Sequence, residues 1–183
     1  LIPSHWLLRM GYPLRLYMER PHHVSRFLAR HLAGDGPLGQ ARLLISRKAN
    51  TTESASSIFG AVKVLRAGMI VCLAGDVRWS GPHTAPAHFL GQDYTFTATW
   101  VALAALARAP VVTSFCRMTP DGRYDLEFRP GFRVPTDAIT TGQAPRLVQA
   151  CLEEVEAQLR ADPANGNEYV SWFQDDARIV EAS

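Results

Sequence analysis

The sequence predicts an α/β fold, in which a mainly parallel sheet is flanked by helices on both faces. Short apolar runs of strand length alternate along the chain with helical patterns. The run at residues 69–74 is apolar throughout, which is typical of a strand buried on both faces of a parallel sheet. No repeat or linker divides the 183 residues, so we expect one domain over residues 1–183.

The composition is that of an ordinary globular protein. Apolar residues make up 47% and charged residues 20% of the chain, which excludes disordered and fibrous classes. A net charge of +2 gives no support to nucleic-acid binding. No apolar run reaches the roughly 18 residues that a membrane span needs. The three cysteines are widely separated, and we interpret them as reduced, buried side chains of a cytoplasmic protein.

The first half of the chain is predicted to contain three strands and two helices. The first strand alternates in polarity, whereas the other two are short apolar runs. The second helix begins at Asn50, which with Glu53 resembles a capping box, and it ends before Gly68. In chain order the elements are strand 12–18, helix 23–32, strand 43–46, the helix with the apolar stripe Ile58, Phe59, Val62 and Leu65, and strand 69–74.

The second half begins with a predicted loop, rich in Gly, Pro and His, that runs to about Tyr94. A buried helix over residues 97–107 and a strand over 111–115 follow. Asp121 and Gly122 are typical of a hairpin turn, with residues 123–128 as the returning strand. The last helix has the apolar stripe Leu147, Cys151, Val155 and Leu159, with Val148 and Leu152 beside it and Glu153, Glu154 and Glu156 facing water.

Charged residues follow several of the predicted strands. In a parallel α/β sheet the ligand crevice lies at the carboxyl ends of the strands. We expect Arg47 with Lys48, Asp76 with Arg78, and Arg117 to lie there. Structural roles stay open for these residues: Asp76 as a helix cap or as a partner of Arg78, and Arg47 as a solvated strand end.

Several apparent cofactor-binding motifs do not have the surrounding sequence or the spacing that their function requires. Residues 34–39 match G-x-G-x-x-G, but they follow a helix and precede a strand, the reverse of a dinucleotide site. The six histidines lack the spacing of zinc ligands, and the chain contains no P-loop or G-x-S-x-G motif. We therefore expect neither a metal ion nor another cofactor.

Six short sequence blocks follow one another over residues 12–118. The first is a strand that ends in an aromatic residue, Arg and Pro, and the second is an arginine followed, after a helix, by the motif "LRAGMIV". The other four are a motif with Asp, a motif with Phe-x-Gly, a segment rich in threonine, and a segment that ends in "APVV". In this order they resemble the lysophospholipid acyltransferase superfamily, most closely its bacterial lipid A biosynthesis (lauroyl/myristoyl) acyltransferase branch. The blocks are residues 16–21, 45–47 with 65–71, 74–78, 87–91, 95–99 and 103–112.

The resemblance implies an O-acyltransferase of lipid A, and hence lipopolysaccharide, biosynthesis. Its donor would be an acyl-carrier protein or acyl-CoA thioester, and its acceptor a hydroxyl of a lipid or glycolipid. It also implies a place on the cytoplasmic face of the bacterial inner membrane, peripheral or anchored by an upstream segment. We expect the surface near Trp79, Phe89 and Trp100 to meet lipid headgroups.

The family's general base is a histidine in the pattern H-x-x-x-x-D/E, which the resemblance places before Leu1. We therefore expect an N-terminally truncated chain, and whether this segment alone is active stays open. His88 and Asp93 match the pattern, but we interpret them as a chance match because six histidines and 17 acidic residues make one easy to find. By resemblance Asp76 and Arg78 support catalysis, whereas substrate binding falls to Arg47, Lys48, Phe89 and Gly91.

Two other functions stay open. One is a catalytically inactive relative of the same fold that binds lipids or acyl chains. The other is a general phospho-ligand-binding domain, which ranks last because the sequence shows no Gly-rich loop between a strand and a helix.

Overall fold

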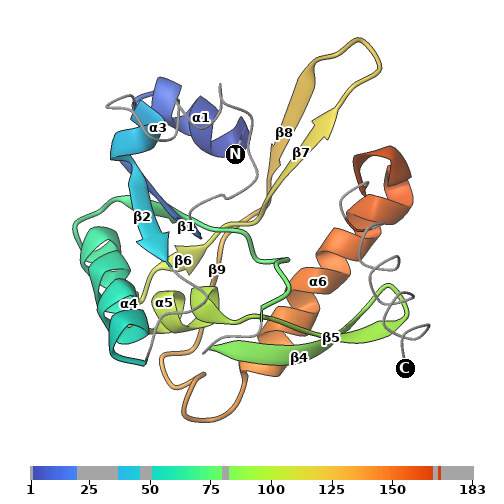
Figure 1. The fold of residues 1–183 in the computed structure, drawn as a ribbon. Coiled ribbons are helices and arrows are strands. Elements are labelled where there is room, and N and C mark those ends of the chain that lie inside the picture. Colours follow the sequence, from blue (N-terminus) through green and yellow to red (C-terminus); the bar gives the residue numbers. More distant parts are fainter. Residues whose placement is uncertain (1, 20–36, 46–50, 80–82, 167–168, 170–183) are drawn as a thin grey trace, which may run out of the picture.

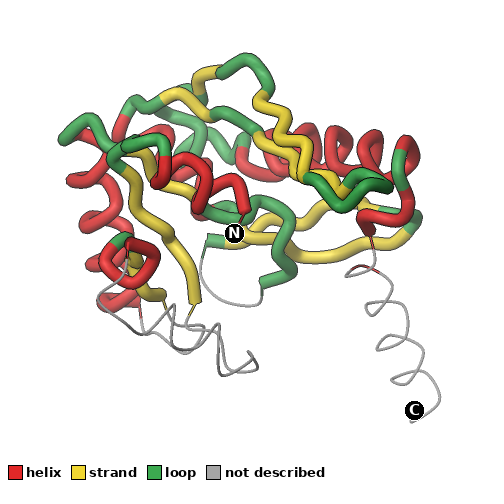
Figure 2. Tube along the Cα trace, turned by 90° about the horizontal axis from the view of Figure 1, so that it is seen from above, coloured by secondary structure: helices red, strands yellow, loops and turns green. Residues whose placement is uncertain are grey.

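The structure is a computed structural model that describes residues 2–19, 37–45, 51–79, 83–166 and 169 (Figure 1). Seen from above, helices lie among the strands as well as at the sides of the molecule (Figure 2). The predicted helix 23–32 and the predicted cap Asn50 lie outside the described residues. The single domain over residues 1–183 stays a prediction.

The N-terminal half forms a three-stranded parallel sheet with the order β2-β1-β3. The central strand β1 (Leu14–Glu19) pairs with β2 (Arg42–Ile45) on one side and with β3 (Ile70–Cys72) on the other. The short helix α3 (Pro37–Gln40) precedes β2, and α4 (Thr51–Arg66) carries the chain from β2 across to β3. Because β2 and β3 run in the same direction on opposite sides of β1, the chain needs a long connection of this kind between them.

Helices pack on both faces of this sheet because side chains alternate along β1. Tyr17 points to one face, where it meets Ile58 and Val62 of α4 together with α5 (Thr99–Ala107). Leu14 and Leu16 point to the other face, toward α1 (Ile2–Arg9). The predicted arrangement of helices on both faces is therefore present at this sheet.

The remaining strands pair antiparallel, so the prediction of a mainly parallel sheet is not confirmed. Hairpins with tight turns can only be antiparallel, and two of them, at residues 90–91 and 121–122, follow in the sequence. The fold is mixed α/β, with three two-stranded sheets among the described residues. These sheets are β4 (Thr84–Phe89) with β5 (Gln92–Thr97), β6 (Pro110–Val111) with β9 (Phe132–Arg133), and β7 (Ser114–Met118) with β8 (Tyr124–Phe128).

The hairpin β4–β5 lies where the sequence predicted a loop. Its turn is Leu90-Gly91, with φ of 51° and 83°. Two successive positive φ values are those of a type I′ turn, which Gly91 adopts without strain. The alternation of buried Ala85, Ala87 and Phe89 with exposed neighbours is the period of a half-buried strand, but the prolines and histidines between them hide it in the sequence.

The largest core cluster lies between this hairpin, α5 and α6 (Ala144–Ala161), which ends before the 3-10 turn Pro163–Gly166. Phe89, Phe96 and Val101 are completely buried there, and so are Val148 and Leu152 of α6. Helix α5 is buried through Ala105, as its all-round apolar pattern predicts. Figure 1 shows α6 running along the same side of the molecule as β4.

Three predictions about burial are corrected by this packing. Strand β3 is half-buried instead of buried on both faces, because it is an edge of its sheet. Phe59 is 62% exposed, so it lies outside the buried stripe of α4. Two glutamates of α6 that were expected to face water are hydrogen-bonded instead. Glu154 accepts from Thr113 Oγ1, and Glu156 accepts from the backbone N–H of Leu90.

No helix in the described ranges is both long and apolar enough to cross a membrane.

Phenylalanines 96 and 59 form a matched pair for testing the core. Phe96→Ala removes a completely buried ring, so we expect the free energy of unfolding to fall by about 3–5 kcal/mol. Phe59→Ala removes a ring that is 62% exposed and should cost less than about 1 kcal/mol. Urea denaturation followed by circular dichroism measures both, and equal losses would contradict this packing.

Candidate functional site

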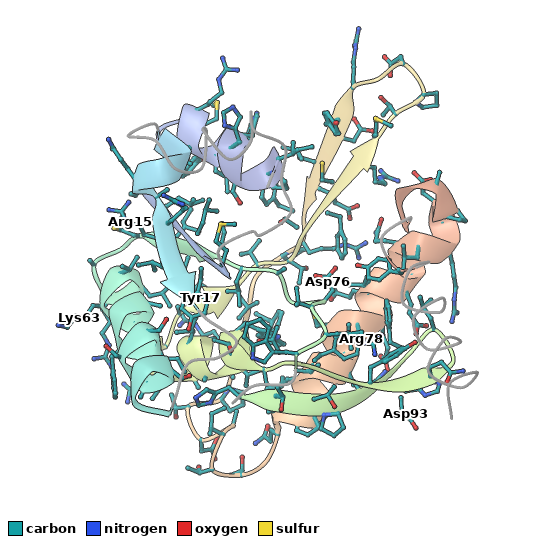
Figure 3. The ribbon with its side chains drawn as sticks, in the orientation of Figure 1. Arg15, Tyr17, Lys63, Asp76, Arg78 and Asp93 are labelled. Atoms are coloured by element: carbon teal, nitrogen blue, oxygen red, sulfur yellow. The ribbon has the colours of Figure 1, made fainter. Side chains whose placement is uncertain are left out.

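The chain leaves the parallel sheet after β3 and joins the β4–β5 hairpin as an additional antiparallel partner of β5. The backbone N–H of Thr97 donates to Val77 O (3.1 Å), and that of Trp79 donates to Thr95 O (3.0 Å). Arg78 forms an isolated bridge with Phe96. These bonds hold Asp76 and Arg78 on the segment between the two sheets (Figure 3).

Asp76 accepts a hydrogen bond from the hydroxyl of Tyr169, at the far end of the described chain. The Tyr169 ring is 6% exposed and packs edge-on against Phe89, with ring centroids 5.4 Å apart. A buried ring of this kind has little freedom to move its hydroxyl. The orientation of the Asp76 carboxylate is therefore fixed from the core.

Arg78 lies with its guanidinium carbon 4.4 Å from the centroid of the Tyr94 ring. Tyr94 is 8% exposed, so the cation rests on a fixed aromatic face. Asp76 and Arg78, two residues apart in the sequence, are thus each held by an aromatic residue from elsewhere in the chain.

A small cavity of about 210 Å³ lies beside this segment, between α6, β9 and the residues before β7. It is mostly apolar, and Glu154 at its wall accepts a hydrogen bond from Thr113 Oγ1 (3.0 Å). A Cβ added to Gly75 would lie 3.5 Å from Cys151 Sγ, which places the cavity next to Asp76. The lining residues are Thr113, Phe132, Leu147, Ala150, Cys151 and Glu154.

A buried donor lies in the same region. Trp100 is 6% exposed, and its Nε1–H has no hydrogen-bond partner within the described ranges. The position that a Cβ on Gly75 would occupy is 4.0 Å from this nitrogen. A buried polar group without a partner is costly, and such groups concentrate at functional sites.

The Cys151 thiol is a poor nucleophile in this environment. Burial, together with the negative charges of Asp76 and Glu154, raises the pKa of its thiol from 9.0 to about 11. Since the thiolate is the reactive form, this thiol is protonated and inert near neutral pH. All three cysteines are free, as predicted, although they are half-buried instead of fully buried.

His88 and Asp93 do meet: His88 Nδ1 lies 2.9 Å from Asp93 Oδ1. They are opposite one another in the β4–β5 register, so the hairpin alone brings them together. Their side chains are 60% and 93% exposed, and strand alternation puts them on the opposite face from Phe89 and Tyr94. The pair is therefore separated by the hairpin from Asp76 and Arg78.

Phe89 and Gly91, predicted to bind substrate, have structural positions here. Phe89 is completely buried in the main core, and Gly91 occupies the hairpin turn. A role in substrate binding stays a prediction for both residues. Arg47 and Lys48 lie outside the described residues.

Two expectations about the surface are wrong. Arg117 lies within the antiparallel strand β7 and not at the carboxyl end of a parallel strand. The surface expected near Trp79, Phe89 and Trp100 to meet headgroups does not exist as such, because Phe89 and Trp100 are 0% and 6% exposed. Their aromatic character reflects core packing.

The sequence patterns missed Tyr169, Trp100 and Cys151 as neighbours of Asp76. None of them belongs to a local motif, and they approach Asp76 only through the packing of α5 and α6. In the part of the chain that the structure describes, no group of three or more His, Cys, Asp or Glu side chains is placed to hold a metal ion.

A comparison with protein families bears on this site. The model for bacterial lipid A biosynthesis acyltransferases matches residues 41–174, well over half of the chain. The chain belongs to this family. The matched span contains Asp76, Arg78, His88 and Asp93, and it runs past the last resembling block as far as the region of Tyr169. A search of curated proteins found no match.

The high pKa of Cys151 predicts slow alkylation in this lipid A acyltransferase family member. At about pH 8 a pKa near 11 leaves roughly 100-fold less thiolate than a pKa of 9.0. We expect iodoacetamide to label Cys151 far more slowly in the native protein than in guanidinium, as measured by peptide mass spectrometry. The stability gained by keeping the thiol neutral is complete below about pH 9 and is lost as the pH rises through about 11. Equal rates in both states would contradict this environment.

Proposed function

We propose that the protein is an O-acyltransferase that moves a fatty acyl group from an acyl-carrier protein or acyl-CoA thioester to a hydroxyl of a lipid or glycolipid acceptor, of the lipid A type. Membership of the family supports acyltransferase activity in general. The observation in this chain that carries the proposal is the held pair of Asp76 and Arg78 after β3.

The reaction defines what these residues have to do. The acceptor oxygen forms a bond to the thioester carbonyl carbon, and the bond from that carbon to sulfur breaks. The hydroxyl proton passes to a base and then to the departing thiolate. A guanidinium beside the reacting carbonyl stabilises the developing oxyanion or binds an anionic group of donor or acceptor, which is the role we assign to Arg78.

Asp76 has a positioning role in this proposal. Its carboxylate is oriented by the Tyr169 hydroxyl, and it lies two residues before Arg78, where the chain bends after β3. A fixed negative charge there keeps cationic side chains oriented toward the substrate without taking the proton itself.

The base in this proposal is the histidine of an H-x-x-x-x-D/E pair expected to precede Leu1. The His88–Asp93 pair has a suitable internal geometry, since Asp93 at Nδ1 leaves Nε2 free to accept a proton. Its exposure and its position on the opposite face of the hairpin from Arg78 argue against this role. We also propose a peripheral location on the cytoplasmic face of the bacterial inner membrane.

A second candidate function is a catalytically inactive relative that binds lipids or acyl chains. The observation that favours it is the largely apolar cavity between Phe132, Leu147 and Ala150, next to Asp76, whose lining suits an acyl chain. Such a protein binds acyl-CoA without turnover.

Asp76→Asn and Asp93→Asn form a matched pair of carboxylate variants. The assay measures transfer of a lauroyl group from acyl-carrier protein to a lipid A precursor by the full-length protein, with the acylated product detected by mass spectrometry. We expect Asp76→Asn to lower kcat/KM by at least about 10-fold. Asp93→Asn should stay within about twofold of the wild type, because Asp93 is 93% exposed on the far face. Equal losses would contradict the assignment of the site.

His88→Ala and Arg78→Ala complete this test. We expect His88→Ala to retain activity, and its complete loss in a folded variant would make His88 the base. Arg78→Ala should raise KM or lower kcat about 10-fold or more. If the wild type binds acyl-CoA and transfers no acyl group, the second candidate function replaces the first.

A further inference from the structure

The outward face of α1 is both apolar and basic. Ile2, Trp6 and Met10 recur every four residues, and their exposed fractions are 39%, 43% and 60%. His5 and Arg9 are exposed beside them. The inward side of the helix is used for packing, where Leu7 and Leu8 contact the face of the parallel sheet that carries Leu14. Within the described ranges, the outward apolar stripe belongs to none of the core clusters.

The hairpin β7–β8 has one apolar face. The register pairs Met118 with Tyr124, and these two side chains are 57% and 52% exposed. Phe128, farther along the same face, is 41% exposed. The other face carries charged residues, including the cross-strand pair Arg117 and Asp125. Figure 1 shows this hairpin extending away from the rest of the molecule.

These two faces form one surface. The rings of Trp6 and Phe128 lie 6.2 Å apart between centroids, so the stripe of α1 continues into the apolar face of the hairpin. Large apolar side chains gathered on one exposed face mark an interaction site, whereas scattered ones do not. We name this the α1–hairpin surface, formed by Ile2, Trp6, Met10, Met118, Tyr124 and Phe128.

The charge around the α1–hairpin surface selects the kind of partner. Residues 2–13 contain Arg9 and no acidic residue. Arg123 is 84% exposed at the hairpin tip, where Asp121 pairs with it. Trp and Tyr beside Arg on an exposed apolar face suit the interface of an anionic bilayer. A second copy fits less well, since a two-fold contact would set the basic α1 of each copy against the same patch.

We propose that the α1–hairpin surface docks on an anionic phospholipid bilayer, with the apolar side chains at the level of the headgroups and Arg9 among the lipid phosphates. The surface is a different one from the Asp76–Arg78 site, so docking leaves that site's contacts unchanged. The proposal deepens the proposed function, because an enzyme with a lipid acceptor has to meet a membrane, but it rests on the exposed residues alone.

The test is sedimentation of the protein with vesicles of phosphatidylcholine alone and with about one quarter phosphatidylglycerol. We expect binding to the anionic vesicles and at least 10-fold weaker partitioning for the double variant Met118→Ser with Tyr124→Ser. Arg9→Gln should weaken binding to anionic vesicles about fivefold and leave the weak binding to neutral vesicles unchanged.

Phe59→Ser with Leu106→Ser is the matched control, because these side chains are 62% and 46% exposed on α4 and α5, outside the α1–hairpin surface. It should bind vesicles like the wild type. Circular dichroism confirms that each variant is folded. Equal binding by the hairpin variant and the control, or no preference for phosphatidylglycerol, overturns the proposal. The proposal is also overturned if light scattering shows that the wild type is a dimer, the hairpin variant is a monomer, and the wild type does not bind vesicles.

An acyl-transfer assay in detergent separates this inference from the proposed function. A hairpin variant that is active in detergent but does not sediment with vesicles supports both. If the wild type binds anionic vesicles but transfers no acyl group, the proposed activity is overturned, and the proposed docking surface is still supported.

Discussion

Antiparallel pairing on both sides of β5 is the constraint on which the rest of the structure depends. On one side β4 pairs with it through the Leu90-Gly91 turn, and on the other side residues 77–79 bond to Thr95 and Thr97. Since side chains alternate along a strand, this pairing sends Phe89 and Phe96 into the core and His88 and Asp93 to solvent. The same bonds hold Asp76 and Arg78 between the two sheets.

The candidate site is built by aromatic side chains that come from distant parts of the chain. Tyr169 orients the carboxylate of Asp76, and Tyr94 supports the guanidinium of Arg78. Tyr169 in turn packs on Phe89, so the core of the hairpin and the orientation of the site are coupled. Burial of Cys151 beside Asp76 raises the pKa of its thiol, so this thiol stays protonated near neutral pH.

Local sequence patterns predicted helices α4, α5 and α6 well, but they missed the shorter helices α1 and α3 and predicted the sheets poorly. Helix α5 is apolar all round and helix α6 has a clear apolar stripe, and both form where expected. The Asp121-Gly122 turn also forms as predicted. The hairpin β4–β5 was missed because Pro86 and His88 point outward between the small or aromatic residues that face the core, and such residues are typical of loops. Strand pairing depends on partners far along the chain, which periodicity does not specify.

By itself the sequence determined the family, the presence of both helices and strands, and the candidate residues Asp76 and Arg78, because blocks of local sequence and their order carry that information. Only the tertiary structure decided which residues meet. It joined Tyr169 to Asp76, buried Phe89 and Trp100 where a lipid-facing surface was expected, and exposed Trp6 and Tyr124 instead. The physical reason is that a side chain's identity sets what it is able to contact, whereas burial and partners follow from how distant segments pack.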